Sequence, residues 1–322
     1  MLYKRITADG TIDEPSGKPD PQFALPSTVN WMRSLALLVE NDITFASSKA
    51  HYAADGKRAM SAQVENTIFE QLFLGLHHLS ALEQMVDPSR AADFSRVATL
   101  GWYYGISNAA AAMTAAQNGS FQADHSSTAR MWDIEVAARG KALGAFGWRA
   151  SSLVEKTYKA EMQSYRQGSS ASLLSTPYTH ADALGAATAY LSGSAKWYAS
   201  YATDDLRNSA AFKALGVDNF MTKKAQNLRN EKLAQRRIGF IHQASRYRGK
   251  ANYREALFLG YGSSTGTILS SLVQDQATVL RSFLQMAGAF SSRKLGKDLW
   301  QEFVADVDMQ RAFSVSALSV WS

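Results

Sequence analysis

A basic segment with one histidine is the part of this sequence best suited to chemistry. Gln235–Tyr261 reads QRRIGFIHQASRYRGKANYREALFLGY, and Lys223–Arg254 holds ten lysines or arginines against one acid, Glu231. The whole chain carries a net charge of only +6, so positive charge is concentrated here. Such a concentration of positive charge predicts a surface that binds phosphate groups. The alternative is a solvated helix face that contacts an acidic partner.

Arg237 and His242 are the pair in this segment whose side chains suit phosphate chemistry. Chemistry on a phosphate without a metal needs a group that moves protons and a fixed cation that stabilises charge on the phosphate. Histidine suits the first task because its ordinary pKa lies near neutrality, and arginine suits the second because it binds phosphate in a bidentate way. Five residues correspond to about 140° on an ideal helix, so one narrow helix face would not hold both. The structural alternative is that His242, among apolar neighbours, is a core or boundary residue.

The remaining polar side chains of the segment are candidates for substrate binding. Arg246 follows His242 by four residues, which predicts the same helix face. Asn252 suits a hydrogen bond to a base or ribose, although its position also predicts the N-cap of a new helix. Tyr253 suits stacking on a base or packing at a helix start. The predicted substrate-binding residues are Arg236, Arg246, Arg248, Lys250, Asn252, Tyr253 and Arg254.

No metal or cofactor is predicted. The chain has no cysteine, which excludes disulfides and thiolate metal sites. His77 and His78 are adjacent in an apolar helical pattern, where neighbouring side chains point about 100° apart and do not share a metal. Glu65, Glu70 and Glu83 have no E-x-x-H partner, so a di-iron bundle is disfavoured.

The elements that must position these residues are predicted to be helices. Apolar residues recur at three- and four-residue spacing over long stretches, and only 6 prolines are present. Four of these prolines lie in residues 1–27, which predicts an extended N-terminal arm followed by a helix capped by Ser27 or Thr28. Residues 28–322 are predicted to form one helical domain. The serine-rich stretch QGSSASLLSTP marks a candidate subdomain boundary at 167–178.

Further helix limits follow from turn and capping residues. Asn118 and Gly119 predict a turn, and Asp124 or Ser126 is placed to cap the helix after it. Helices are predicted over 58–86, 92–117, 179–202, 204–214, 219–247, 252–261, 266–290 and 296–320.

The chain shows no sign of a membrane segment. Its start, MLYKRITADG, lacks the apolar core of a signal peptide, and no apolar run reaches the roughly 18 residues of a membrane span. We therefore expect a cytoplasmic protein without membrane association.

Three pieces of the sequence, in order, carry a resemblance to the HEPN superfamily. Tyr103–Ala110 (YYGISNAA), a glycine turn and then His125–Ser126 resemble the middle helices of HEPN domains. Arg237–His242 resembles the R-x4-6-H motif of HEPN ribonucleases, and Arg236 fits the same motif with five intervening residues. Arg248–Tyr253 (RGKANY) resembles the R-x-x-A-[D/N]-Y pattern of the nucleotidyltransferase-associated branch.

The resemblance covers about 95–290 and implies a HEPN-like helical bundle with additional helices. The region 145–230 exceeds a minimal bundle, which implies a long central insertion or a different all-helical fold. The resemblance further implies an RNA-binding, metal-independent endoribonuclease of toxin or antiphage-effector type, with Arg237 and His242 as its catalytic pair. It also implies a homodimer that shares one cleft, and a neutralising or activating protein partner.

Two alternatives stay open, the second of them from another class of protein. One is a non-catalytic helical module whose basic groove holds nucleotide, nucleic acid or a protein partner. The other is a structural assembly protein whose basic segment contacts an acidic neighbour.

Overall fold

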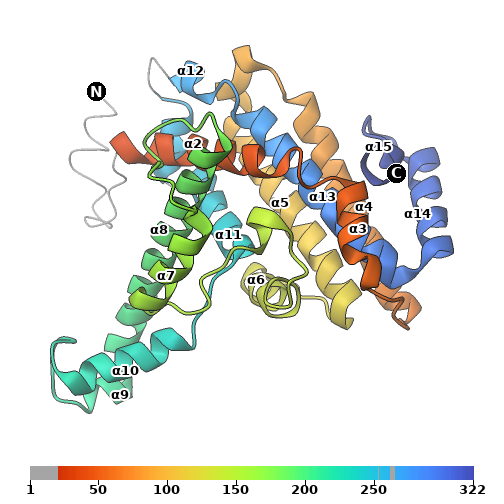
Figure 1. Cartoon of the computed structure of the whole chain (residues 1–322). Coiled ribbons are helices and arrows are strands. Elements are labelled where there is room, and N and C mark those ends of the chain that lie inside the picture. The colour runs from red at the N-terminus through yellow and green to blue at the C-terminus, as the bar shows by residue number, and fades with distance from the viewer. Residues whose placement is uncertain (1–20, 253, 262–264) are drawn as a thin grey trace.

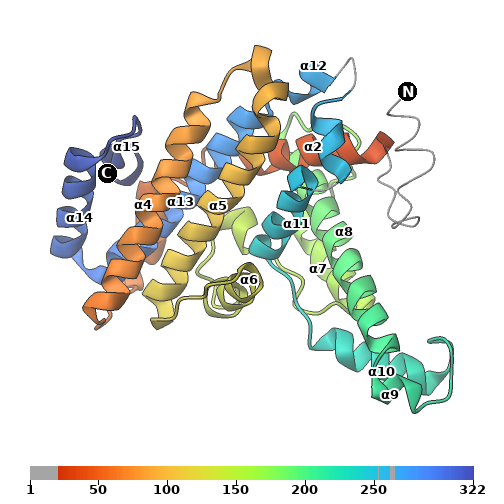
Figure 2. The same cartoon turned by 180° about the vertical axis from the view of Figure 1, so that it is seen from behind.

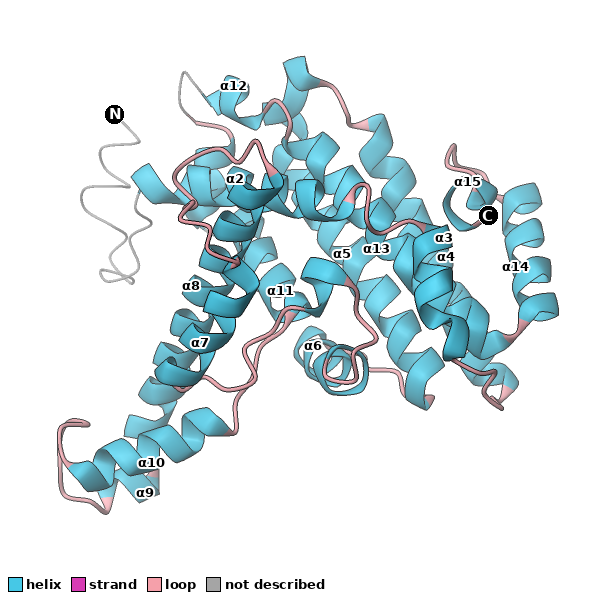
Figure 3. Cartoon of the chain, in the orientation of Figure 1, coloured by secondary structure: helices cyan, strands magenta, loops and turns pink. Residues whose placement is uncertain are grey.

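The chain folds into helices joined by turns and by loops of various lengths (Figure 1). The computed structural model describes residues 21–252, 254–261 and 265–322. Within these ranges no β-strand is present, and one isolated antiparallel bridge pairs Ala150 with Ile238 (Figure 3). The all-α prediction is therefore confirmed. No helix in the described ranges is long and apolar enough to cross a membrane.

Five long helices form the frame of the described chain. They are α2 (Pro21–Val39), α4 (Ala62–Gln84), α5 (Ala91–Asn118), α8 (His180–Arg207) and α13 (Leu272–Leu295). Shorter helices cover or extend the frame: α3 (Phe45–His51), α6 (His125–Trp132), α7 (Glu155–Arg166), α9 (Ala210–Lys213), α10 (Lys223–Ala234), α11 (Phe240–Asn252), α12 (Thr265–Leu269), α14 (Lys297–Gln310) and α15 (Ala317–Trp321). Helix α13 packs against α2, α3, α4 and α5, which places it in the middle of the frame (Figures 1 and 2).

Large aromatic side chains join α2, α8 and α11 at one end of the core. The Trp31 ring of α2 stacks on Tyr190 of α8 with centroids 4.2 Å apart, and it lies 4.8 Å from the Tyr247 ring of α11. Trp102 of α5 meets Trp31 edge-on at 5.9 Å. All four side chains are buried, so this contact fixes α11 against the frame.

The first helix begins earlier than the sequence predicted. Residues 1–20 lie outside the described ranges, and α2 starts at Pro21, within the predicted extended arm. The prediction that Ser27 or Thr28 caps this helix is wrong, because both hydroxyls lie inside it and donate to the Ala24 carbonyl at 3.1 and 2.7 Å. Interior hydroxyls of this kind bond backward to the preceding turn.

The predicted turn after α5 is confirmed. Gly119 adopts φ +82° and ends α5, as a left-handed C-terminal residue commonly does. Asp124 then caps α6, because its side chain accepts a hydrogen bond from the Ser127 N–H at 2.9 Å. Both features depend only on neighbouring residues.

The loop that follows α7 packs against the frame. Asn30 of α2 donates from its side chain to the carbonyl of Leu173 at 2.8 Å, and the Leu173 side chain is buried in the main core. The serine-rich stretch therefore connects α7 to α8 along the surface of α2.

Helices α9 and α10 lie at the far end of α8 and project away from α5 and α13 (Figures 1 and 2). We call residues 196–237 the basic arm, since they contain nine lysines or arginines and four acids. The arm holds its own small apolar cluster, formed by Leu206, Phe212, Phe220 and Ala225. The single helix predicted for 219–247 is wrong, because the chain leaves the helix after Ala234 and re-enters it at Phe240.

Candidate functional site

Backbone hydrogen bonds hold the connection between α10 and α11 against the segment that precedes α7. Ala150 and Ile238 exchange both N–H to carbonyl bonds, at 2.9 and 3.1 Å. The Leu153 N–H also lies 3.1 and 3.0 Å from the carbonyls of Leu233 and Arg236. Ile238 is buried, whereas Arg236 and its neighbour in sequence Arg237 are exposed.

Arg237 therefore lies in a fixed connection ahead of α11 and not on the same helix as His242. The expected 140° separation on one helix does not apply, because the two residues belong to different elements. Both side chains line one cleft.

This cleft has a volume of about 560 Å³ and lies between α6, α8, the connection and α11. We call it the α6–α11 cleft. It brings together three of the predicted site residues, Arg236, Arg237 and His242. Further polar residues of its lining are His125, Ser126, Ser127, Arg130, Tyr198, Tyr201 and Ser245.

His242 sits at the start of α11 and is electrically neutral at pH 7. Its Nδ1 accepts a hydrogen bond from the Gly239 N–H at 3.2 Å, so the proton of the neutral ring is on Nε2. Burial lowers the pKa of His242 to about 4, with Asp133 opposing the shift and Arg149 adding to it. The Tyr198 hydroxyl donates to the His242 carbonyl at 3.3 Å and fixes α8 against this turn.

A buried ion pair supports the floor next to His242. Asp133 begins η3 (Asp133–Ala137), a π-helical turn after α6, and its carboxylate is fully buried. Arg149 binds it in a bidentate way, from Nε to Oδ1 at 3.0 Å and from an Nη to Oδ2 at 2.7 Å. A Cβ at position 239 would lie 2.8 Å from the same Oδ1, so Gly239 allows α11 to start against this pair.

His125 enters the cleft from the first turn of α6. Its ring centroid lies 5.2 Å from the Tyr103 ring and 5.7 Å from the Tyr104 ring. Burial lowers the pKa of His125, the charge of Arg248 lowers it further, and Asp124 opposes both. The imidazole is therefore mostly neutral at pH 7, with a lower pKa than a free histidine.

The segments that carry the HEPN resemblance touch one another. The Arg248 guanidinium of α11 lies over the Tyr103 ring of α5, 4.8 Å from its centroid, and the His125 ring contacts the same tyrosine. Arg248 thus packs at the edge of the site on an aromatic ring.

Two predicted substrate-binding residues make internal contacts instead. Arg246 donates to the Ser194 hydroxyl of α8 at 3.1 Å and lies over the Tyr190 ring. Lys250 is buried and donates to the Ser27 hydroxyl of α2 at 3.0 Å. Neither side chain lines the cleft, because α11 turns them toward α8 and α2.

The end of the predicted segment differs from expectation. Asn252 is exposed and is the last residue of α11, so the prediction that it caps a new helix is wrong. Tyr253 and the side chain of Arg254 lie outside the described residues.

Sequence reasoning missed part of the cleft. Arg130 lies on α6, and Tyr198 and Tyr201 share a face of α8 at three-residue spacing. Tyr201 is 60% exposed, and Trp197 beside it is nearly half exposed. The signal available in the sequence was the run of aromatic residues at Trp197, Tyr198 and Tyr201.

The comparisons with known proteins add no family to this description. Models of known protein families, curated proteins and solved structures were each compared with the chain, and none matches it. Among the described residues, no group of three or more His, Cys, Asp or Glu is placed to hold a metal ion.

Proposed function

We propose that this chain is a HEPN-like protein that binds single-stranded RNA in the α6–α11 cleft and cleaves it without a metal ion. One observation carries the proposal: Arg130, Arg236, Arg237, His125 and His242 converge on a single cleft from three separate segments. Arginine supplies fixed positive charge for phosphate, and neutral imidazoles supply proton transfer and hydrogen bonding. Tyrosines on α8 offer rings on which bases stack.

The arginines of the connection are suited to the phosphate. Arg236 and Arg237 are exposed, and neither forms an ion pair with another described residue. Their backbone is fixed by the hydrogen bonds to Ala150 and Leu153, so the guanidinium groups start from a rigid base. A preorganised cation of this kind stabilises the extra negative charge of the pentacoordinate phosphate.

The two histidines take different roles in the proposal. His125 is the base that removes the proton from the 2′-hydroxyl, because its ring is neutral at pH 7 and its nitrogens are not used in capping α6. The 2′-oxygen bonds to phosphorus and the 5′-oxygen leaves, taking its proton from the imidazolium. His242 donates from Nε2 to a phosphate oxygen, since its Nδ1 is used by Gly239.

The test is RNA cleavage in EDTA with matched variants. Wild type is expected to leave 2′,3′-cyclic phosphate ends on single-stranded RNA. Arg237→Ala and His125→Asn are each expected to lower the rate about 100-fold. His242→Asn keeps an acceptor for the Gly239 N–H, so a loss of rate there reports on chemistry more than on folding. Lys297→Ala removes an exposed charge on α14 and serves as the control.

A second function is favoured by one feature of the same site. Because the Nδ1 of His242 is occupied at the helix start, the R-x4-H pair also suits a non-catalytic module that only holds RNA. RNA binding by wild type without cleavage would support that module. A folded wild type that neither binds nor cleaves RNA would contradict both functions and favour the assembly protein.

The homodimer stays a prediction from the resemblance. One chain already brings Arg237 and His242 to the same cleft, so the proposal does not require a second copy to unite them. Sedimentation of the purified protein over a concentration series would measure its oligomeric state.

A further inference from the structure

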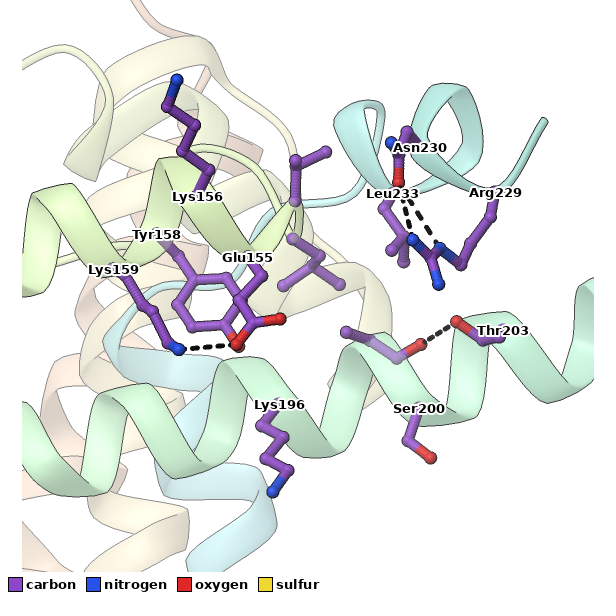
Figure 4. Close-up of a pocket in the computed structure, with 13 residues that line it drawn as sticks. Glu155, Lys156, Tyr158, Lys159, Lys196, Ser200, Thr203, Arg229, Asn230 and Leu233 are labelled. Atoms are coloured by element: carbon purple, nitrogen blue, oxygen red, sulfur yellow. Dashed lines mark hydrogen bonds and ion pairs between the residues drawn. The ribbon is translucent and has the colours of Figure 1, made fainter. Parts of the chain in front are cut away.

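A second basic pocket lies on the other side of Leu153 from the α6–α11 cleft. Its volume is about 640 Å³, and it opens between α7, α8 and α10. Figure 4 shows Lys159 of α7 and Lys196 of α8 on one side and Arg229 of α10 on the other. Lys156 belongs to the lining but points away from this group (Figure 4). The proposed cleavage does not use these residues.

The pocket keeps a surplus of positive charge. Glu155 is the one acid among its lining residues, and it pairs with Lys159 at 2.6 Å. The hydrogen bond from Lys159 is the main cause that lowers the pKa of Glu155, and Lys196 and Arg229 contribute more weakly. One carboxylate therefore faces three cations, two of which it does not bind directly.

The partners of Arg229 are neutral groups. Its guanidinium donates to the Asn230 side-chain carbonyl at 3.3 and 3.4 Å, and it lies 5.8 Å from the Phe220 ring centroid. Lys196 forms no ion pair within the described part of the chain. Both groups are thus available to an incoming anion, and the half-buried Arg229 is held in place by its contacts.

Helix α10 connects the pocket to the cleft. Leu153 lines both, and its N–H contacts the carbonyl of Leu233 in the last turn of α10 and that of Arg236 just after the helix. The helix carries Arg229 into the pocket, while the connection that follows carries Arg236 into the cleft. Arg229 lines the pocket and Arg236 lines the cleft, and Leu153 lies between the two spaces, so the two arginines are placed to contact different phosphates of one strand.

We propose that this pocket binds a phosphate of the same RNA strand whose scissile phosphate lies in the α6–α11 cleft. The inference rests on the proposed RNA binding and adds a length requirement to it. A strand that reaches both places gains a second charge-assisted contact, whereas a short fragment held in the cleft does not. The substrate class is therefore single-stranded RNA of several nucleotides, and a mononucleotide is a poor ligand for the pocket.

The experiment measures binding without cleavage. Fluorescently labelled 2′-O-methyl RNA lacks the attacking hydroxyl, so a trinucleotide and a dodecanucleotide can be titrated in EDTA at several salt concentrations. The pocket variant combines Lys196→Gln with Arg229→Gln. The matched control combines Lys213→Gln with Lys224→Gln, which removes the same charge from exposed positions of the basic arm outside the pocket.

The expected result depends on RNA length. The pocket variant should bind the dodecanucleotide about tenfold more weakly than the control variant does, and its salt slope should fall by about 0.7, the value for one phosphate of a single strand. Its affinity for the trinucleotide should equal that of wild type. Glu155→Gln, which releases Lys159, should bind the dodecanucleotide more tightly.

Several outcomes would overturn the inference, and they are distinguishable. If the pocket variant and the control variant bind the dodecanucleotide equally, RNA binding stands and the pocket has no part in it. If adenosine monophosphate binds wild type as tightly as the dodecanucleotide and loses binding in the pocket variant, the pocket is a nucleotide site. Wild type that binds neither RNA overturns the proposed function and this inference together.

Discussion

The helical body around α13 and the basic arm are built on opposite principles. The body buries large side chains such as Trp31, Phe283 and Phe290, and α13 is covered along most of its length. The arm buries a small cluster of its own and places Ala202 and Leu233 in a second one, yet its nine cations and four acids supply five of the six net positive charges. The comparison indicates that most of the buried apolar surface, and with it most of the stability, resides in the body, whereas most of the net positive charge resides in the arm.

The largest expected effect tests the difference in burial. Trp31→Ala removes a ring that packs on Tyr190 and Tyr247, and it should lower the free energy of unfolding by about 3–5 kcal/mol. Phe212→Ala in the arm should lower it by about 1–2 kcal/mol, because the small cluster can unfold locally. Urea denaturation measures both values. Equal losses would show that arm and body unfold as one unit.

The next effect concerns the ion pair below the cleft. Asp133→Asn leaves the partly buried Arg149 without a carboxylate, and we expect a loss of about 3 kcal/mol in the free energy of unfolding. Asp204→Asn removes the partner of Arg207 on the arm, where both side chains are exposed, and should have no measurable effect. Thermal unfolding of the two variants compares them. An unchanged melting temperature of the Asp133→Asn variant would mean that the buried ion pair does not stabilise the body.

A smaller effect is the pH dependence that His242 contributes. Its pKa is about 4 in the folded protein and 6.5 in the unfolded chain, so the unfolded state takes up the proton first as the pH falls. The contribution is complete above pH 6.5 and is lost between pH 6.5 and 4. It amounts to at most about 3 kcal/mol, and solvent around the partly exposed ring reduces it.

The measurement compares wild type with His242→Asn in urea at pH 7 and at pH 4.5. The variant should lose less stability on acidification than wild type does. His180→Asn, which removes an exposed histidine, should follow wild type. Identical pH profiles for all three proteins would contradict the low pKa of His242.

Substitution of the two arginines of the connection should have the smallest effect on stability and a clear effect on RNA binding. The double variant Arg236→Ala, Arg237→Ala removes two exposed side chains of the connection and should unfold like wild type within about 0.5 kcal/mol. Its salt slope for single-stranded RNA should fall by about 1.4, which corresponds to two lost phosphate contacts. Unchanged RNA binding would show that Arg236 and Arg237 do not contact the RNA as proposed.

Local signals explain which parts of the fold could be predicted. Helix α5 ends at Gly119 and α6 begins after Asp124, as the sequence predicted, because the turn and the cap depend on residues a few positions away. The break between Ala234 and Phe240 was missed because it depends on Ala150, a residue distant in sequence that pairs with Ile238.

The same distinction applies to the site. The pattern of residues gave Arg236, Arg237 and His242, and these do line one cleft. Lys250 was misplaced because its burial depends on Ser27 of α2, more than two hundred residues earlier. Charge counted along a sequence does not distinguish a lysine directed into the core from one directed to solvent.

The pairing of Ala150 with Ile238 also determines when the cleft comes into existence during synthesis. Closing a loop of this length carries an entropic penalty that contacts between neighbouring helices do not carry, so we expect this pairing to form late in folding. The cleft draws on residues from His125 to Ser245. A nascent chain that still lacks α11 therefore has no complete cleft. The cleft can form only after α11 has left the ribosome.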